Sequence, residues 1–237
     1  MNKLLSLSGY FVKKDAINIR TGILILSALL AGGTVMVANN VLEHQFSNNM
    51  IYYTYGYIAQ YFLLYFSVSY WGIEFQKKTI NMLITSGRSS ISLYIAKMNA
   101  YIIHTLIFFV FAFLEVAIYV VAIGARDSLF KIFSSLLVTY LAYGAFVFSC
   151  SSLLVIVTKK FVISLVGVWM LMSVFPAVSV LVQNYSVGAY MRLIPFSFII
   201  EAFNFNCFTR EQIVITLIWI VVLFLGGIFI FKKRGRV

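Results

Sequence analysis

Residues 98–123 read "MNAYIIHTLIFFVFAFLEVAIYVVAI", and this run decides the fold class. It holds a single acidic residue, Glu115, and no lysine or arginine. A helix needs about 20 consecutive apolar residues to cross the hydrocarbon core of a membrane. A membrane β-barrel would instead show strands of about 10 residues with alternating polarity. The continuous run therefore predicts a transmembrane helix.

Five further apolar runs of similar length occur along the chain. They cover residues 21–39, 50–72, 132–157, 161–182 and 212–231. The 237-residue chain is 62% hydrophobic and 11% charged, whereas soluble domains carry about 25% charged residues. No polar segment is long enough to form a separate folded domain. The sequence predicts one all-α membrane domain, residues 1–237, with six transmembrane helices.

Lysines and arginines are distributed unevenly between the segments that connect these runs. With the N-terminus on the inner side, the inner segments hold four, four, two and four of them, and the outer segments hold four in all. Because positive residues favour the cytoplasmic side of a membrane, both termini are predicted in the cytoplasm. The net charge of +11 then reflects orientation and attraction to membrane lipid, and no nucleic acid partner is predicted.

Two connecting segments are unlike simple loops. Residues 1–20 mix apolar side chains with lysines and are too polar to span, which predicts an interfacial helix. Residues 183–211 are apolar but interrupted by Arg192, Pro195 and Glu201. A segment of this kind can enter the outer leaflet and return if it is buried against protein. We therefore predict a pair of short re-entrant helices before the sixth span.

Motifs for catalysis or cofactor binding are missing from the sequence. It contains no GxxxxGK[ST] phosphate loop, no HExxH pair and no paired cysteine motif. Cys150 lies in an apolar run and Cys207 in a connecting segment, so we expect two unpaired thiols. Neither a catalytic residue, nor a metal site, nor a cofactor is predicted in this chain.

Three residues within the spans are candidates for a translocation path. Glu115 is the one clear carboxylate inside a span, and a charge at such a depth usually faces protein or water. Tyr57 and Tyr61 belong to the tyrosine-rich start of the second span. A simpler interpretation exists for each. Glu115 can be a protonated or hydrogen-bonded structural residue, and the tyrosines can serve core packing or the interfacial aromatic belt.

The connection between the second and third spans is charged and has a helical pattern of its own. Residues 73–97 read "IEFQKKTINMLITSGRSSISLYIAK". Apolar residues recur at helical spacing, which predicts a short helix over residues 77–85 that ends at Gly87. Ser89 or Ser90 would then be the N-cap of the following helix.

This segment resembles the corresponding loop of the type-2 ATP-binding-cassette (ABC) export permeases. In that family a glutamate, a basic residue followed by threonine, an apolar pair, an arginine and a lysine follow the second span in this order. The matching residues here are Glu74, Lys78–Thr79, Leu83–Ile84, Arg88 and Lys97. Family members often carry a proline where this chain has Gly87. The six spans, the interfacial helix and the re-entrant segment extend the resemblance over the whole chain.

The resemblance implies that the loop is a cytoplasmic coupling helix, which docks on a separate ATPase subunit. The residues that it assigns to ATPase coupling are Glu74, Lys77, Lys78, Thr79, Leu83, Arg88 and Lys97. The working unit would contain two ATPase copies, which bind ATP and Mg, and a second permease subunit in a homo- or heterodimer. The implied function is export of an amphipathic peptide, a bacteriocin or a drug by a transporter subunit that is not itself an enzyme.

Two other functions stay open on the sequence alone. A membrane immunity or sensor component without transport would share the topology but would stimulate no ATPase. A membrane-embedded enzyme would require catalytic side chains at one depth, whereas His104 and Glu115 lie eleven residues apart, about 16 Å of helix rise.

Overall fold

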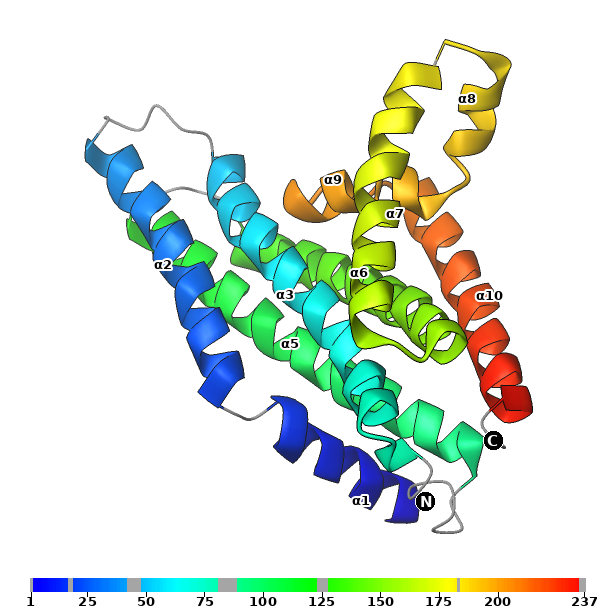
Figure 1. Ribbon diagram of the computed structural model, residues 1–237. Coiled ribbons are helices and arrows are strands. Elements are labelled where there is room, and N and C mark those ends of the chain that lie inside the picture. Colours follow the sequence, from blue (N-terminus) through cyan, green and yellow to red (C-terminus); the bar gives the residue numbers. More distant parts are fainter. Residues whose placement is uncertain are drawn as a thin grey trace.

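The computed structural model describes residues 2–16, 19–41, 48–80, 89–122, 128–182 and 184–234. Within these ranges the chain is almost entirely helical and contains no β-strand. The long helices run side by side as a bundle, and short helices lie at its two ends (Figure 1). This arrangement confirms the predicted all-α fold class.

Each predicted apolar run coincides with one long helix. In chain order, with the labels of Figure 1, the elements are α1 (Asn2–Phe11), η1 (Val12–Ala16), α2 (Ile19–Val41), α3 (Asn48–Gln76), α5 (Ser90–Ala122), α6 (Leu129–Thr158), α7 (Phe161–Val182), α8 (Ser186–Met191), η2 (Pro195–Ser197), α9 (Ile199–Asn204) and α10 (Arg210–Arg234).

Five of the long helices have the length and apolar composition of a membrane span. These are α2 over Ile19–Ala38, α5, α6, α7, and α10 over Arg210–Lys233. They give the chain the character of a multi-pass membrane protein. α3 does not reach the same hydropathy although it is 29 residues long, because seven of those residues are tyrosines. A sixth span in α3 therefore stays a prediction.

The polar groups of α3 are used in contacts with neighbouring helices. α3 packs against α2, α5, α6, α7 and α9. The buried Tyr55 hydroxyl donates to the carbonyl of Phe108 in α5 at 3.2 Å, and Ser151 of α6 donates to Ser67 of α3 at 2.7 Å. Hydrogen bonds of this kind hold helices together where lipid offers no alternative partner. A central helix can therefore be less apolar than those at the periphery.

α5 begins at Ser90, whereas the sequence predicts the third span from residue 98. The Oγ of Ser89 accepts a hydrogen bond from the Ser92 N–H at 3.1 Å, so Ser89 is the N-cap that starts the helix. Lys97 marks the expected boundary because a lysine normally stays in water. Here its side chain is completely buried, and the helix runs through it.

One end of the bundle, which we call the basal end, contains α1, the last turn of α3, the first turns of α5 and the last turn of α10 (Figure 1). α1 packs on α5. Its Leu7 and Phe11 are buried, while Tyr10 is 56% exposed. The N-terminal segment is thus helical, with apolar residues on its buried side, and it divides into α1, π-helical η1 and the start of α2 instead of forming one helix to residue 20. Its place at a membrane interface stays a prediction.

At the opposite end the chain folds into α8, η2 and α9 before α10 begins. α8 stands beside the end of α7, and α9 lies across the bundle (Figure 1). Phe203 of α9 stacks on Tyr143 of α6 with ring centroids 4.2 Å apart, and Asn206 accepts hydrogen bonds from Ser135 and Thr139. The two short helices expected in this segment are therefore present, with α9 buried against protein. Their entry into a membrane leaflet stays a prediction.

Candidate functional site

The best-defined polar site lies at the basal end around the carboxylate of Glu74. Glu74 is in the last turn of α3, Lys97 is near the start of α5, and Lys14 is in η1. These three residues are far apart in the sequence and meet only because α1 and α5 pack beside the end of α3. We call this group the Glu74 cluster.

Lys97 is the fully buried member of the Glu74 cluster, and its ammonium group has several partners. It donates to the Glu74 carboxylate and to the carbonyl of Tyr70. Its Nζ lies 4.3 Å from the ring centroid of Trp71 and 5.1 Å from that of Phe11. Aromatic faces attract cations, and the attraction is strongest where water is excluded. The free-energy cost of burying the Lys97 ammonium group is therefore offset by a carboxylate, a carbonyl and two aromatic rings.

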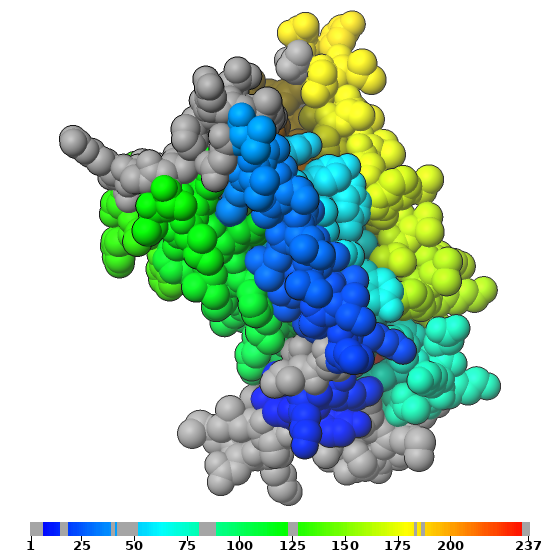
Figure 2. Space-filling view, turned by 90° about the vertical axis from the view of Figure 1, so that its left-hand side faces the viewer, coloured from blue at the N-terminus to red at the C-terminus, as the bar shows by residue number. Residues whose placement is uncertain are grey.

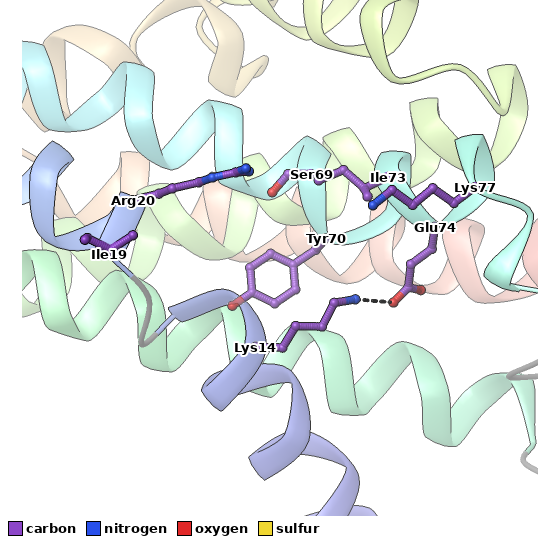
Figure 3. A pocket seen from close by; sticks show the side chains of 8 residues that line it. All are labelled: Lys14, Ile19, Arg20, Ser69, Tyr70, Ile73, Glu74 and Lys77. Carbon is purple, nitrogen blue, oxygen red and sulfur yellow. Dashed lines mark hydrogen bonds and ion pairs between the residues drawn. The ribbon is translucent and has the colours of Figure 1, made fainter.

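The Glu74 carboxylate is shared between a buried and an exposed lysine. Its Oε1 lies 3.5 Å from the Nζ of Lys14 (Figure 3), whose side chain is 42% exposed, whereas the side chain of Glu74 is 6% exposed. Removal of one partner from a buried ion pair typically costs about 3–5 kcal/mol, because the remaining charge is left uncompensated. The cluster thus fixes η1, the end of α3 and the start of α5 relative to one another.

The structure gives two of the predicted coupling residues a place inside the chain. Glu74 is 4% exposed and Lys97 is not exposed at all, so neither side chain is available on the surface of this chain. Their assignment to ATPase coupling stays a prediction, and their burial leaves them a role through other residues of this chain. They support the base of the 73–97 connection.

Lys77 and Lys78 form an exposed turn directly after α3. The Lys77 N–H donates to the carbonyl of Ile73 at 2.9 Å, and the Lys78 N–H donates to that of Phe75 at 3.2 Å. Lys78 has a φ of 55°, in the left-handed region that non-glycine residues seldom adopt. Helical backbone resumes only at Thr79. Helical backbone thus begins two residues later than predicted, because the two lysines form a turn.

The remaining predicted coupling residues lie further along this connection. The Thr79 hydroxyl donates to the carbonyl of Glu74 at 3.4 Å, so the residue that opens the next helical segment folds back onto α3. Leu83 and Arg88 lie outside the described residues, and so does most of the helix predicted over 77–85.

A row of tyrosines runs along one face of α3 at four-residue spacing. The ring centroids of Tyr53 and Tyr57 are 5.7 Å apart, and those of Tyr57 and Tyr61 are 5.4 Å apart. The Tyr61 hydroxyl donates to that of Tyr57 at 3.3 Å, and these two side chains are 41% and 43% exposed. Hydroxyls that face hydrocarbon lack partners. This tyrosine row is therefore better suited to protein, water or a substrate than to lipid.

Glu115 lies inside the bundle between α5 and α2. It is 6% exposed, and its two carboxylate oxygens have no hydrogen-bond partner among the described residues. A Cβ placed on Gly32 of α2 would collide with this carboxylate, so α2 approaches Glu115 closely through a glycine. Of the three predicted path residues, Tyr57 and Tyr61 are together on the surface, whereas Glu115 is in the interior.

His104 packs among aromatic rings and does not form a pair with Glu115. Its ring centroid lies 4.1 Å from that of Phe66 and 5.6 Å from that of Phe108. Neither imidazole nitrogen has a hydrogen-bond partner in the described part of the chain. This environment does not favour the alternative of a membrane-embedded enzyme that uses these two residues.

Sequence reasoning missed some residues that the structure brings to polar sites. Lys14 belongs to the Glu74 cluster, and its only signal in the sequence is its place in an amphipathic segment. At the opposite end, Arg192, Glu201 and Glu211 line a cavity of about 460 Å³ beside α7 and α10. The sequence indicates Arg192 and Glu201 only as interruptions of an apolar segment.

Comparisons of the sequence with protein-family models and with curated proteins find no match.

Proposed function

We propose that this chain is the membrane-spanning subunit of an ATP-driven ABC exporter. A separate ATPase, present in two copies, binds ATP and Mg and hydrolyses the nucleotide, and a second permease subunit completes the transporter. The chain itself is then not an enzyme and needs no cofactor. It resides in the bacterial cytoplasmic membrane with both termini in the cytoplasm.

The observation that carries this proposal is the Glu74 cluster at the base of the connection between α3 and α5. A coupling element transmits force only if its ends are fixed to the helices that must move. The Glu74–Lys97 pair joins the end of α3 to the start of α5, and Lys14 joins η1 to both. A displacement of the exposed turn at Lys77 and Lys78 would therefore be passed to all three segments together.

The tyrosine row supports a path for an amphipathic substrate. Tyr57 and Tyr61 present aromatic rings and a pair of hydrogen-bonded hydroxyls on an exposed face of α3, beside the half-buried Tyr53. Lipid would offer the remaining donor and acceptor capacity of these hydroxyls no partner. A second permease subunit placed against this face would enclose the row. Rings and hydroxyls together suit a substrate with apolar and polar parts, such as a peptide, a bacteriocin or a drug.

The charge of the basal end supports the proposed orientation. At that end Lys13 follows α1, Lys78 follows α3, Lys160 precedes α7 and Lys233 lies in the last turn of α10. Lys131, in contrast, is at the start of α6 toward the other end. Lysines and arginines near span ends favour the cytoplasmic side. A soluble ATPase would then meet the exposed turn after α3.

The experiment that tests the proposal is purification with the ATPase encoded beside this chain. We expect a stable complex whose ATPase activity rises with some member of a panel of amphipathic peptides and drugs. Thr79→Arg should weaken the complex or uncouple hydrolysis, with normal membrane insertion, whereas Ser128→Arg at the other end serves as the control. Absence of a complex would contradict the proposal. A chain that protects cells from a peptide without any ATPase would be an immunity component.

A further inference from the structure

A cavity of about 320 Å³ lies at the basal end between η1, the start of α2 and the end of α3. This volume is at the lower end of the range for small-ligand sites, about 300–1,000 Å³. Ile19, the first residue of the candidate span in α2, lines the cavity. The cavity therefore lies where a candidate membrane span begins, and lipid headgroups would surround this position if α2 crosses the membrane.

The side chains around this cavity carry a surplus of positive charge. Lys14, Arg20 and Lys77 line it, and Glu74 is the one carboxylate among those lining residues that the structure describes. Glu74 is already paired with Lys97 and with Lys14. Arg20 and Lys77 consequently have no acidic partner in the described part of the chain. Among the described side chains, positive charge at this cavity therefore exceeds negative charge, which suits the binding of an anion.

Arg20 and Lys77 approach the cavity from opposite sides. In Figure 3 the charged ends of Arg20 and Lys77 point toward Ser69 and Ile73, which lie between them. A guanidinium group offers parallel donors to a phosphate, and an ammonium group adds a point charge. Arg20 is also the second residue of α2, where the helix dipole favours negative charge. An anion with several oxygens, such as a phosphate group, fits this arrangement.

An apolar ridge begins at the cavity and continues along α2. Ile19, Ile23, Leu26 and Leu30 follow one another at spacings of four, three and four residues, and each is more than half exposed. This spacing places them on one face of the helix. Figure 2 shows α2 at the surface along its length, directly above α1. A phosphate that carries acyl chains would use both the cavity and the ridge, whereas a free phosphate ion would use only the cavity.

We propose that this cavity binds the phosphate group of an anionic membrane phospholipid, whose acyl chains lie along the α2 ridge. The phosphate group, which carries one negative charge, lies between Arg20 and Lys77 and links the start of α2 to the end of α3. The site stands independently of the proposed transport function.

The test measures phosphatidylglycerol binding to the full-length chain and to the variant Arg20→Gln/Lys77→Gln. Protein is held in phosphatidylcholine nanodiscs with increasing phosphatidylglycerol, and native mass spectrometry counts the lipid retained. Each cation near an anionic headgroup is worth about fivefold in binding, so the double variant should bind about 25-fold more weakly. The matched control Lys232→Gln/Lys233→Gln removes two exposed cations from the end of α10 and should leave binding unchanged.

Competition with inorganic phosphate distinguishes a site for a phospholipid headgroup from a site for free phosphate. We expect that it does not displace the retained phosphatidylglycerol, because it gains nothing from the ridge. Displacement by inorganic phosphate would overturn the lipid assignment, and equal losses in the cavity variant and the control would overturn the site. If the double variant does not fold, Lys77→Gln alone replaces it in the test. This single variant should weaken phosphatidylglycerol binding about fivefold, and a loss no larger than that of the control would overturn the site.

Discussion

Replacement of Lys97 by methionine tests whether the Glu74 cluster holds the basal end together. Methionine keeps most of the apolar stem and removes the ammonium group from a site with no exposure. Glu74 would retain Lys14 at 3.5 Å, but that lysine is 42% exposed, and an exposed ion pair contributes only about 0–1 kcal/mol. Loss of a buried partner costs about 3–5 kcal/mol. Because one partner remains, we expect the free energy of unfolding to fall by about 3 kcal/mol, the lower end of that range.

The assay is reversible unfolding in mixed detergent micelles, followed by tryptophan fluorescence. Lys160→Met removes an exposed cation at the same end and should change the free energy of unfolding by less than about 0.5 kcal/mol. The double variant Lys97→Met/Glu74→Gln should recover most of the loss, because a buried pair can be replaced by neutral groups at little cost. A loss in Lys97→Met no larger than that of the control would refute the reasoning. So would a double variant whose loss equals the sum of the two single losses.

Two further predictions concern the close approach of α2 to α5 and the tyrosine row. Gly32→Ala should lower the free energy of unfolding by about 1–3 kcal/mol, the usual cost of overpacking, since its methyl group would meet the Glu115 carboxylate. Thermal unfolding in detergent measures the loss of stability. Gly33→Ala is the control, because a Cβ at Gly33 meets open space. Adding Glu115→Ala to Gly32→Ala should restore the lost stability. Tyr57→Leu/Tyr61→Leu should leave thermal unfolding nearly unchanged, because both side chains are substantially exposed, yet reduce substrate-stimulated ATPase activity of the purified complex. Unchanged stimulation would remove the tyrosine row from the proposed path.

The positions of the long helices could be predicted because each depends on the length of a continuous apolar run. The start of α5 could also be predicted, because Ser89 is one of the two serines expected as its N-cap. The burial of its first turns could not, since this depends on a partner elsewhere in the chain. Lys97 normally marks the edge of a span, but Glu74, 23 residues earlier, neutralises it inside the protein. The turn at Lys77 and Lys78 could not be predicted from the sequence either. A lysine with a left-handed backbone conformation has no sequence signature comparable to that of glycine.

Individual residues of the candidate site could be predicted from the sequence, but the contacts between them could not. Glu74 and Lys97 could be selected from their order in the connecting loop, but their mutual pairing results from the packing of α3 against α5. The tyrosines of α3 look alike in the sequence. Only the helical phase set by neighbouring helices separates the buried Tyr55 from the exposed Tyr57 and Tyr61.

The most direct test of the central claim is site-specific photo-crosslinking from the exposed turn after α3. A photoreactive residue at Lys78 should crosslink to the partner ATPase in native membranes, and ATP should change the yield. The same residue at Ser128, at the start of α6, should give no crosslink to the ATPase. An ATPase that copurifies but crosslinks from Ser128 and not from Lys78 would contradict the account, because the coupling contact would then lie at the wrong end of the bundle.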